Sequence, residues 1–276
     1  MRYFSDRYRK PFLTYLYVPV TLECNRNCKG CVCYSPLAGS ETRVTLEQFE
    51  RAIKRITEIT GTETIQQVDI SGGEPLLHPD ILKFIEISRS IFTQDIVIRT
   101  NGLLLSYFIE NNWKFIQTHR IKFEISEYPD VPIDKIMSLA KHYKITCWNH
   151  WGKTDFKFRK MGISIKPNYL EMNEEWDKCC DTNCCNTLRI IGDKAYFTGC
   201  STPVFLDILD NYFGTSYEKL IRKGDRIDIY DPTITLDDFL KFHQPIPMCA
   251  YCRRRTGVWF NLEKSEKNKN EWIAKY

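Results

Sequence analysis

The sequence predicts an α/β protein, a partial barrel of five or six parallel strands with a small domain after it. Apolar, β-rich runs alternate with amphipathic helical segments through the first 170 residues, and short connections between them predict right-handed crossovers. Five or six strands are too few to close an eight-stranded barrel. Near Glu171 this alternation stops and cysteines cluster. We therefore expect one domain over residues 1–170, a second over 171–262, and a polar, disordered tail over 263–276.

Composition limits the classes of function. The 276 residues are enough to bury a sizeable core, and 43% hydrophobic with 27% charged residues is ordinary for a globular enzyme. A net charge of +4 does not indicate a nucleic-acid groove. No signal-peptide region and no apolar run of about eighteen residues is present. Twelve cysteines in such a chain indicate metal ligands in a reducing cytoplasm, with neither membrane nor nucleic acid as a partner.

The elements of the predicted barrel follow from hydrophobic periodicity and from turn residues. The expected strands are Leu13–Thr21, Ile65–Ser71, Asp95–Thr100, Arg120–Ser126 and Ile145–Trp148, with a sixth somewhere in Phe156–Ile165. The expected helices are Thr45–Thr60, Pro79–Phe92, Leu104–Phe115 and Ile133–Tyr143. The first helix begins at a capping box, in which Thr45 and Gln48 satisfy each other's backbone, and it ends at Gly61.

The C-terminal domain has weaker local signals. Thr187–Ile191 and Lys194–Thr198 flank Gly192-Asp193, which predicts a β-hairpin. A short helix is expected over Thr235–His243, with Thr235 as its N-cap.

Three cysteines at CxxxCxxC spacing, Cys24, Cys28 and Cys31, directly follow the first strand. Thiolates favour iron–sulfur clusters, zinc or cuprous copper. Structural zinc needs four ligands, and Cys33 would be the fourth in that alternative. The spacing resembles the cluster loop of the radical S-adenosylmethionine (SAM) superfamily, in which three thiolates hold a 4Fe–4S cluster and leave one iron open for SAM. This resemblance covers roughly the first two-thirds of the chain.

The resemblance implies a SAM site at the strand ends. Gly72, Gly73 and Glu74 match the segment that binds the methionine amino group in the family, and Thr100, Asn101 and Ser126 match groups that hold the ribose and the methionine carboxylate. Each polar strand-end residue is equally well explained as a helix or turn cap. Where many members have an aromatic residue before the third cysteine, this chain has Gly30. The resulting CxGC variant is similar to a subgroup associated with carbohydrate chemistry.

The remaining cysteines predict a second cluster. Cys185, Cys200, Cys249 and Cys252 resemble the ligands of a Twitch/SPASM auxiliary domain, in which a saturated 4Fe–4S cluster transfers electrons. Structural zinc is the alternative, because it also favours four thiolates. The first ligand is not decided by spacing alone; the alternatives to Cys185 are Cys179, Cys180 and Cys184.

Cys147, on the predicted fifth strand, is either a small buried residue or a hydrogen-atom donor to a substrate radical. It can donate only if it faces the barrel interior. His150 and Trp151 follow it on a loop and are candidates to line the pocket. Arg159, Arg189 and the run Arg253–Arg255 are alternative anchors for a substrate carboxylate or phosphate.

The resemblance implies that SAM is cleaved reductively to a 5′-deoxyadenosyl radical, which abstracts hydrogen from the substrate. We expect a small polar substrate, namely a sugar, a sugar nucleotide or an aminocyclitol, and dehydrogenation as the outcome. The alternatives are epimerisation with a cysteine hydrogen donor, peptide maturation, and a non-enzymatic electron-transfer or iron-sensing protein. About a dozen residues precede the first strand, too few for a leader-peptide module. The expected electron donor is a flavodoxin or a ferredoxin.

Overall fold

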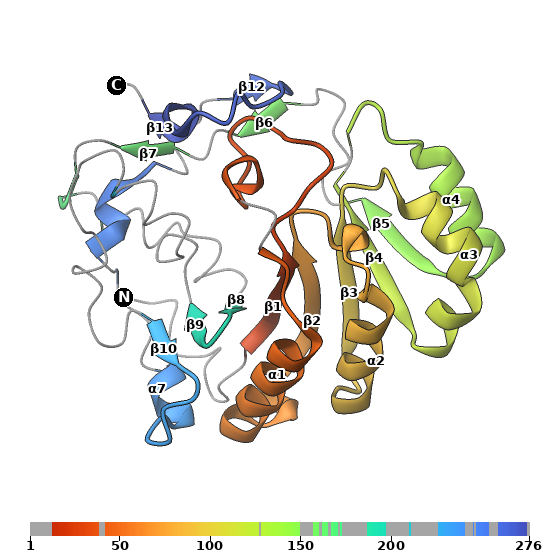
Figure 1. The fold of residues 1–276 in the computed structure, drawn as a ribbon, viewed down its shortest axis with the longest axis horizontal. Coiled ribbons are helices and arrows are strands. Elements are labelled where there is room, and N and C mark those ends of the chain that lie inside the picture. Colours follow the sequence, from red (N-terminus) through yellow and green to blue (C-terminus); the bar gives the residue numbers. More distant parts are fainter. Residues whose placement is uncertain are drawn as a thin grey trace, which may run out of the picture.

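The computed structural model describes residues 13–38, 42–126, 128–149, 157–159, 162–164, 167–170, 172, 187–196, 210, 226–240, 245, 247–253 and 259–274. Its centre is an eight-stranded sheet in the order β10-β9-β8-β1-β2-β3-β4-β5. All neighbours from β8 to β5 are parallel, whereas β8–β9 and β9–β10 are antiparallel. The predicted α/β class and open, partial barrel are confirmed (Figure 1), since the edge strands β10 and β5 have no pairing with each other in the described residues.

The elements lie close to the predicted ranges. The strands of the large sheet are β1 (Leu13–Thr21), β2 (Ile65–Gly72), β3 (Asp95–Thr100), β4 (Ile121–Ile125), β5 (Thr146–Asn149), β8 (Thr187–Ile191), β9 (Lys194–Tyr196) and β10 (Arg226–Asp228). The α-helices are α1 (Leu46–Thr60), α2 (Ile81–Ile91), α3 (Leu105–Thr118), α4 (Ile133–His142) and α7 (Leu236–Leu240). None of the helices in the described residues is both long enough and apolar enough to cross a bilayer.

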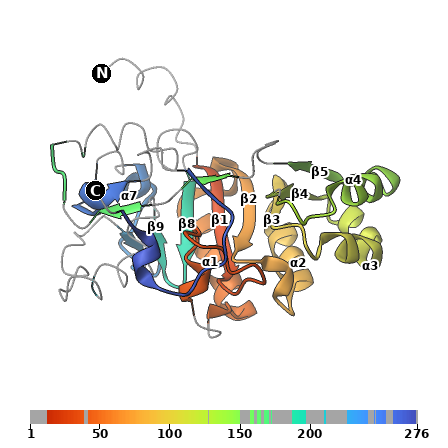
Figure 2. The ribbon, with the colours of Figure 1, turned by 90° about the horizontal axis from the view of Figure 1, so that it is seen from above.

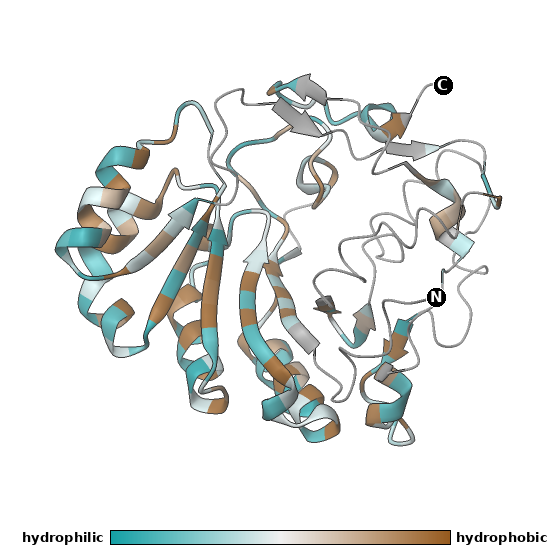
Figure 3. Cartoon of the chain, turned by 180° about the vertical axis from the view of Figure 1, so that it is seen from behind, coloured by the Kyte–Doolittle hydropathy of each residue, from teal (hydrophilic) through white to brown (hydrophobic). Residues whose placement is uncertain are grey.

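Helices α1 to α4 cover one face of the sheet (Figures 1 and 2). Alternate strand residues point into this layer, where Leu16, Val68, Ile98 and Phe123 are completely buried. Hydrophobic residues follow the central strands, whereas the outer turns of α3 and α4 are hydrophilic (Figure 3). The intervening strand residues point to the opposite face of the sheet, which faces the barrel interior. We call this face the inner face.

Local capping signals set the ends of α1. The Thr45 side chain accepts a hydrogen bond from the Gln48 backbone N–H at 3.2 Å, and the Gln48 side chain accepts from the Thr45 N–H at 3.0 Å. Gly61, with φ of 76°, ends the helix as predicted. Thr235 precedes α7, and its N–H and hydroxyl both donate to the Asp238 carboxylate.

The sixth parallel strand is supplied by a distant part of the sequence. The range Phe156–Ile165 contains β6 (Lys157–Arg159) and β7 (Gly162–Ser164), but they pair outside the large sheet. β6 pairs with β12 (Trp259–Asn261), and β7 lies between β11 (Cys252–Arg253) and β13 (Ile273–Ala274). The expectation of a sixth barrel strand in that range is therefore wrong.

The predicted hairpin is present as β8 and β9, and its first strand completes the parallel sheet. β8 lies beside β1, with Arg189 opposite Tyr17. The sheet thus continues across the predicted domain boundary at residue 170, whose position stays a prediction.

The polar segment after Leu262 is ordered, so the expectation of a disordered tail is wrong. A short 3-10 helix, Lys269–Trp272, leads into β13. The Trp272 side chain is completely buried, and Ser265 is buried as well. Ile273 is buried too, so the segment has three buried side chains, whose contribution was not apparent among the many charged residues around them.

Candidate functional site

The cysteine loop begins where β1 ends, at the carboxyl edge of the sheet. Cys28 is buried and Cys24 and Cys31 are half-buried. The loop turns sharply at Asn27 and Gly30, which have φ of 52° and 66°. Glycine adopts that conformation without a steric penalty, which explains the residue found before the third cysteine.

The donor set fits an iron–sulfur cluster better than a single metal ion. Burial, followed by repulsion from Cys31, raises the pKa of Cys28 to about 11, so the thiols lie close enough to influence one another. Among the described residues, however, no three Cys, His, Asp or Glu side chains surround one metal position. A cubane cluster has each thiolate on a different iron, so its ligands stand further apart than those of one zinc ion. Cys33, the fourth ligand in the zinc alternative, hydrogen-bonds with Cys31.

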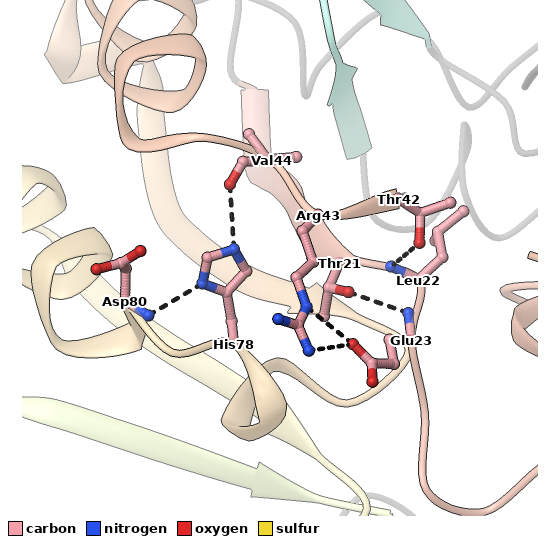
Figure 4. A network of polar contacts seen from close by, with 8 residues as sticks. All are labelled: Thr21, Leu22, Glu23, Thr42, Arg43, Val44, His78 and Asp80. Carbon is pink, nitrogen blue, oxygen red and sulfur yellow. Dashed lines mark hydrogen bonds and ion pairs between the residues drawn. The ribbon is translucent and has the colours of Figure 1, made fainter. Parts of the chain in front are cut away.

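A polar network connects the entrance of the cysteine loop, at residues 21–23, with residues 42–44, and connects Val44 with the turn after β2 (Figure 4). Arg43 donates two hydrogen bonds to the Glu23 carboxylate, at 2.9 and 2.6 Å. His78 contacts the Val44 carbonyl oxygen through Nε2 at 3.1 Å, while its Nδ1 accepts from the Asp80 N–H. Because Nδ1 accepts from Asp80, the proton of a neutral His78 lies on Nε2 and is donated to the Val44 carbonyl oxygen. His78 thus connects the segment before α1 to the turn after β2.

The glycines after β2 allow two backbones to meet. The Gly73 N–H donates to the Thr21 carbonyl oxygen, and the Glu74 N–H donates to the Glu23 carbonyl oxygen, both at 2.8 Å. A Cβ atom on Gly73 would lie only 2.4 Å from the Glu23 carbonyl oxygen. The segment Gly72–Glu74 is therefore paired directly with the entrance of the cysteine loop.

Glu74 is completely buried at this junction. Its Oε1 accepts from the Thr100 hydroxyl at 2.8 Å and from the Leu76 N–H at 3.1 Å, and its Oε2 accepts from the Asn101 N–H at 2.8 Å. Burial raises the pKa of Glu74 to about 7, against the opposing effect of these hydrogen bonds. A carboxylate has about four acceptor positions, so one remains for a ligand donor.

Asn101 connects this carboxylate to the cysteines. Its side-chain amide donates to the Asn25 side-chain oxygen at 2.7 Å and contacts the Cys24 sulfur at 3.7 Å. Ser126 follows β4, is half-buried, and donates its N–H to the Thr100 carbonyl oxygen. The structure thus brings Glu74, Thr100, Asn101 and Ser126 together beside the loop, as expected from their positions at adjacent strand ends.

Arg26 and Tyr128 are site residues that the sequence analysis missed. The Arg26 guanidinium lies 3.8 Å from the centre of the Tyr128 ring and donates to the Asp130 carboxylate at 2.7 Å. Its side chain is only 6% exposed and contacts Cys28. The signal was available, because Arg26 lies between two cysteines and Tyr128 follows the end of the fourth strand.

The inner face of the sheet carries a charged group. Arg99 donates to Asp69 at 2.9 Å and to Glu124 at 2.5 Å, and the two carboxylates are 1% and 8% exposed. The Arg99 side chain is 27% exposed. One guanidinium and two carboxylates give this group a formal charge of −1. Arg189, one of the predicted anchors, lies across the Tyr17 ring at 5.1 Å on the same face.

Cys147 is on the helix-facing side of β5. It is in register with Phe123, whose ring contacts Phe108 of α3, and it packs against the hydrophobic core. Burial raises the pKa of its thiol to about 12. This placement favours the structural interpretation of Cys147 over hydrogen-atom donation.

Only half of the predicted second cysteine group can be placed. Cys249 is buried in a 3-10 helix, Pro247–Tyr251, and Cys252 begins β11. The other residues of this group, and the candidate pocket residues after Cys147, lie outside the described residues: Cys179, Cys180, Cys184, Cys185, Cys200, His150, Trp151 and most of Arg253–Arg255.

Comparisons with known proteins agree with this site. Residues 18–143 match the model of the Radical SAM superfamily. A probable GTP 3′,8-cyclase of Methanothermobacter marburgensis is 34% identical over 100 residues, which cover 36% of this chain and 31% of that protein. A GTP 3′,8-cyclase of Heliobacterium modesticaldum is 36% identical over 97 residues, covering 34% of this chain and 28% of that protein. The match thus spans about a third of these relatives.

The structure resembles that of BtrN in complex with AdoMet and 2-DOIA. The TM-score is 0.55 at 14% identity, and the likeness covers 89% of this chain and 94% of that one. At this identity the likeness concerns the fold. The match to the superfamily model covers fewer than half of the residues, and it includes the cysteine loop and the strand-end residues Glu74, Thr100, Asn101 and Ser126.

Proposed function

We propose, from the radical SAM fold of residues 18–143, that this chain oxidises a small polar substrate, an aminocyclitol or a sugar. The observation that carries this proposal is the inner-face group Asp69, Arg99 and Glu124, on the three strands whose carboxyl ends lead to the proposed SAM site. When bound, the cluster and SAM supply a 5′-deoxyadenosyl radical that removes a hydrogen atom from the substrate.

The chain's own residues hold and orient the reactants. Cys24, Cys28 and Cys31 would ligate the cluster, and Glu74 would accept from the methionine ammonium. Asn101 joins the two sites, because its backbone N–H donates to Glu74 and its side-chain amide contacts Cys24. Gly72 and Gly73 let Glu74 reach this position, and Thr100 fixes its carboxylate. Ser126 at the next strand end is proposed to contact the ribose or the methionine carboxylate.

The inner-face group supports a substrate with hydroxyl or ammonium donors. Two carboxylates accept hydrogen bonds from such groups, and Arg99 supplies donors to an alcohol oxygen.

Dehydrogenation also needs an electron acceptor. Loss of one hydrogen atom, one proton and one electron converts a carbinol to a ketone, and a saturated cluster on Cys185, Cys200, Cys249 and Cys252 is the proposed acceptor of the electron. The length and fold shared with BtrN support this arrangement, which resembles 2-deoxy-scyllo-inosamine dehydrogenase. A flavodoxin or a ferredoxin is the proposed source of the electron for SAM cleavage.

Radical chemistry on a purine nucleotide is a second candidate, and the sequence similarity to GTP 3′,8-cyclases favours it. That similarity is confined to about a third of either chain, in the part that matches the superfamily model. It therefore bears on SAM cleavage more than on the choice of substrate. Epimerisation with a cysteine hydrogen donor is a weaker candidate, since Cys147 faces the helices rather than the inner face.

Anaerobic reconstitution followed by turnover assays tests the proposal. We expect about eight irons per chain, the content of two cubane clusters, and 5′-deoxyadenosine formed from SAM. Aminocyclitols, sugars and GTP are then offered in heavy water, and products are analysed by mass spectrometry. A ketone supports dehydrogenation, deuterium incorporation at unchanged oxidation state supports epimerisation, and GTP consumption supports the cyclase candidate. About four irons with one zinc would refute the electron acceptor.

A further inference from the structure

The cysteine loop is paired with a segment more than two hundred residues further along the chain. The Lys29 N–H donates to the Glu263 carbonyl oxygen at 2.9 Å, and the Ser265 N–H donates to the Asn27 carbonyl oxygen at 2.8 Å. Cys28 forms an isolated antiparallel bridge with Lys264 between these bonds. The Asn27 side-chain amide also donates to the Ser265 carbonyl oxygen at 2.9 Å.

Trp272 contacts the loop at its third cysteine. The indole N–H donates to the Cys31 carbonyl oxygen at 2.9 Å, and the ring lies 6.1 Å from that of Tyr34. Trp272 has no exposed surface, so this hydrogen bond is shielded from water. The loop is thus held on both sides of Cys28 and again at Cys31.

The other end of this segment belongs to a different sheet. β13 follows Trp272 directly and pairs with β7, which pairs in turn with β11, the strand that begins at Cys252. The segment therefore joins the cysteine loop to the strand that carries a proposed ligand of the second cluster.

We propose that residues 263–272, which we call the C-terminal clasp, position the cysteine loop for cluster and SAM binding; this role rests on the proposed function. The loop has few hydrogen bonds of its own, such as those from the Cys31 N–H to the Cys28 carbonyl oxygen at 3.3 Å and from the Tyr34 N–H to the Cys31 carbonyl oxygen at 3.1 Å. Holding each residue in one backbone conformation has an entropic cost of about 1–2 kcal/mol. The clasp supplies the contacts that hold the loop in a single conformation before the cluster binds.

Trp272 is the positioning residue that best separates this role from simple packing. Trp272→Phe keeps an aromatic ring against Tyr34 and removes the N–H that Cys31 accepts, together with one of the two fused rings of the buried indole. In the protein without cluster, we expect the amides of residues 28–34 to exchange with deuterium about five- to tenfold faster, the effect of losing one shielded hydrogen bond. After reconstitution, the spectrum of the reduced cluster should respond more weakly to SAM.

Glu266→Gln is the matched control. Glu266 is exposed and lies within the clasp, so exchange and spectra should stay within about twofold of the unmodified chain, as for most surface substitutions. Unchanged exchange and an unchanged response to SAM in Trp272→Phe would overturn the proposal.

A second variant guards against misfolding of Trp272→Phe. Asn27→Gly retains the left-handed conformation at φ of 52° and removes the side-chain donor to Ser265. We expect faster exchange of the loop here too, with unchanged protection in β2 and β3. If the unmodified chain forms no 5′-deoxyadenosine, the proposed function fails, whereas the exchange experiment still decides whether the clasp holds the loop.

Discussion

At the residue scale, Glu74 combines complete burial with three hydrogen-bond donors. Burial disfavours the ionised carboxylate, and the donors favour it. Because burial has the larger effect, the pKa rises from its ordinary value to about 7. The group is thus close to half-ionised at neutral pH, where SAM binding is proposed to need its charge.

A pH profile tests this arrangement. Since only ionised Glu74 accepts from an ammonium group, kcat/KM for SAM cleavage should rise with pH through about 7, because this ratio reports on the free enzyme. Stability without ligand should change in the opposite sense. A carboxyl whose pKa is raised by folding stabilises the fold below its ordinary pKa and loses that contribution as pH rises through about 7.

Glu74→Gln should remove this step in the activity profile and weaken SAM binding about tenfold or more, as expected for a hydrogen bond to a charged group. The variant should retain its iron, because Glu74 is not a cluster ligand. A profile with the same step in the variant would assign the titration to another group.

Arg26 gives a second prediction at this scale. Arg26→Gln loses the cation–π contact with Tyr128. The free energy of unfolding of the protein without its cluster, measured by urea titration, should therefore fall by about 1–2 kcal/mol. Asp130 is 61% exposed in its side chain, so Asp130→Asn should cost at most about 1 kcal/mol. Equal losses in the two variants would show that the ion pair, rather than the ring contact, holds Arg26.

The place of these residues in the site was predictable only where a motif indicated it. Cys24, Glu74 and Asn101 follow strands whose ends meet at one edge, so their proximity followed from sequence order. Arg26 was passed over because a charged residue between cysteines is usually solvated. Its burial depends on Tyr128, a partner about a hundred residues away, and no local pattern reports such a contact.

At the element scale, the turn after β2 is determined by the space between two backbones. Gly73→Ala would place a Cβ 2.4 Å from one carbonyl oxygen and 2.5 Å from another. We expect a loss of about 1–3 kcal/mol in the free energy of unfolding, the usual cost of overpacking, together with reduced iron content after reconstitution.

Gly192→Ala is the control for the general effect of replacing a turn glycine. Among the described residues, apart from its two neighbours in the chain, no atom lies within 4 Å of the position that its Cβ would take. Because φ is 60°, we expect a cost of about 1–2 kcal/mol from backbone strain. Its iron content should match that of the unmodified chain. Iron loss in this variant would show that the cluster defect of Gly73→Ala does not come from the steric clash.

Elements with local signals were predictable, and those defined by distant partners were not. β1 and β3 have the predicted bounds, and α1 has the predicted cap, because alternation and capping are local. The hairpin of β8 and β9 was predicted from Gly192-Asp193. That β8 would extend the parallel sheet beside β1 was not predictable, since a short apolar strand carries no information on its partner.

At the scale of the whole molecule, the large sheet contains strands from both predicted domains. β1 lies between β2 and β8, and the clasp joins the cysteine loop to β13. We therefore expect a single cooperative unfolding transition in urea. Amides of β3 and of β8 should lose protection from deuterium exchange at the same urea concentration. Two separated transitions would instead support independent domains.

The long reach of the clasp has a consequence for how the protein matures. Trp272 and Cys31 are 241 residues apart along the chain, so most of the polypeptide must be synthesised before the loop acquires its final shape. During translation the three thiols emerge early and stay without this support. If the clasp positions the loop as proposed, we expect metal loading to follow the synthesis of residues 263–272, so the three thiols must stay reduced until then.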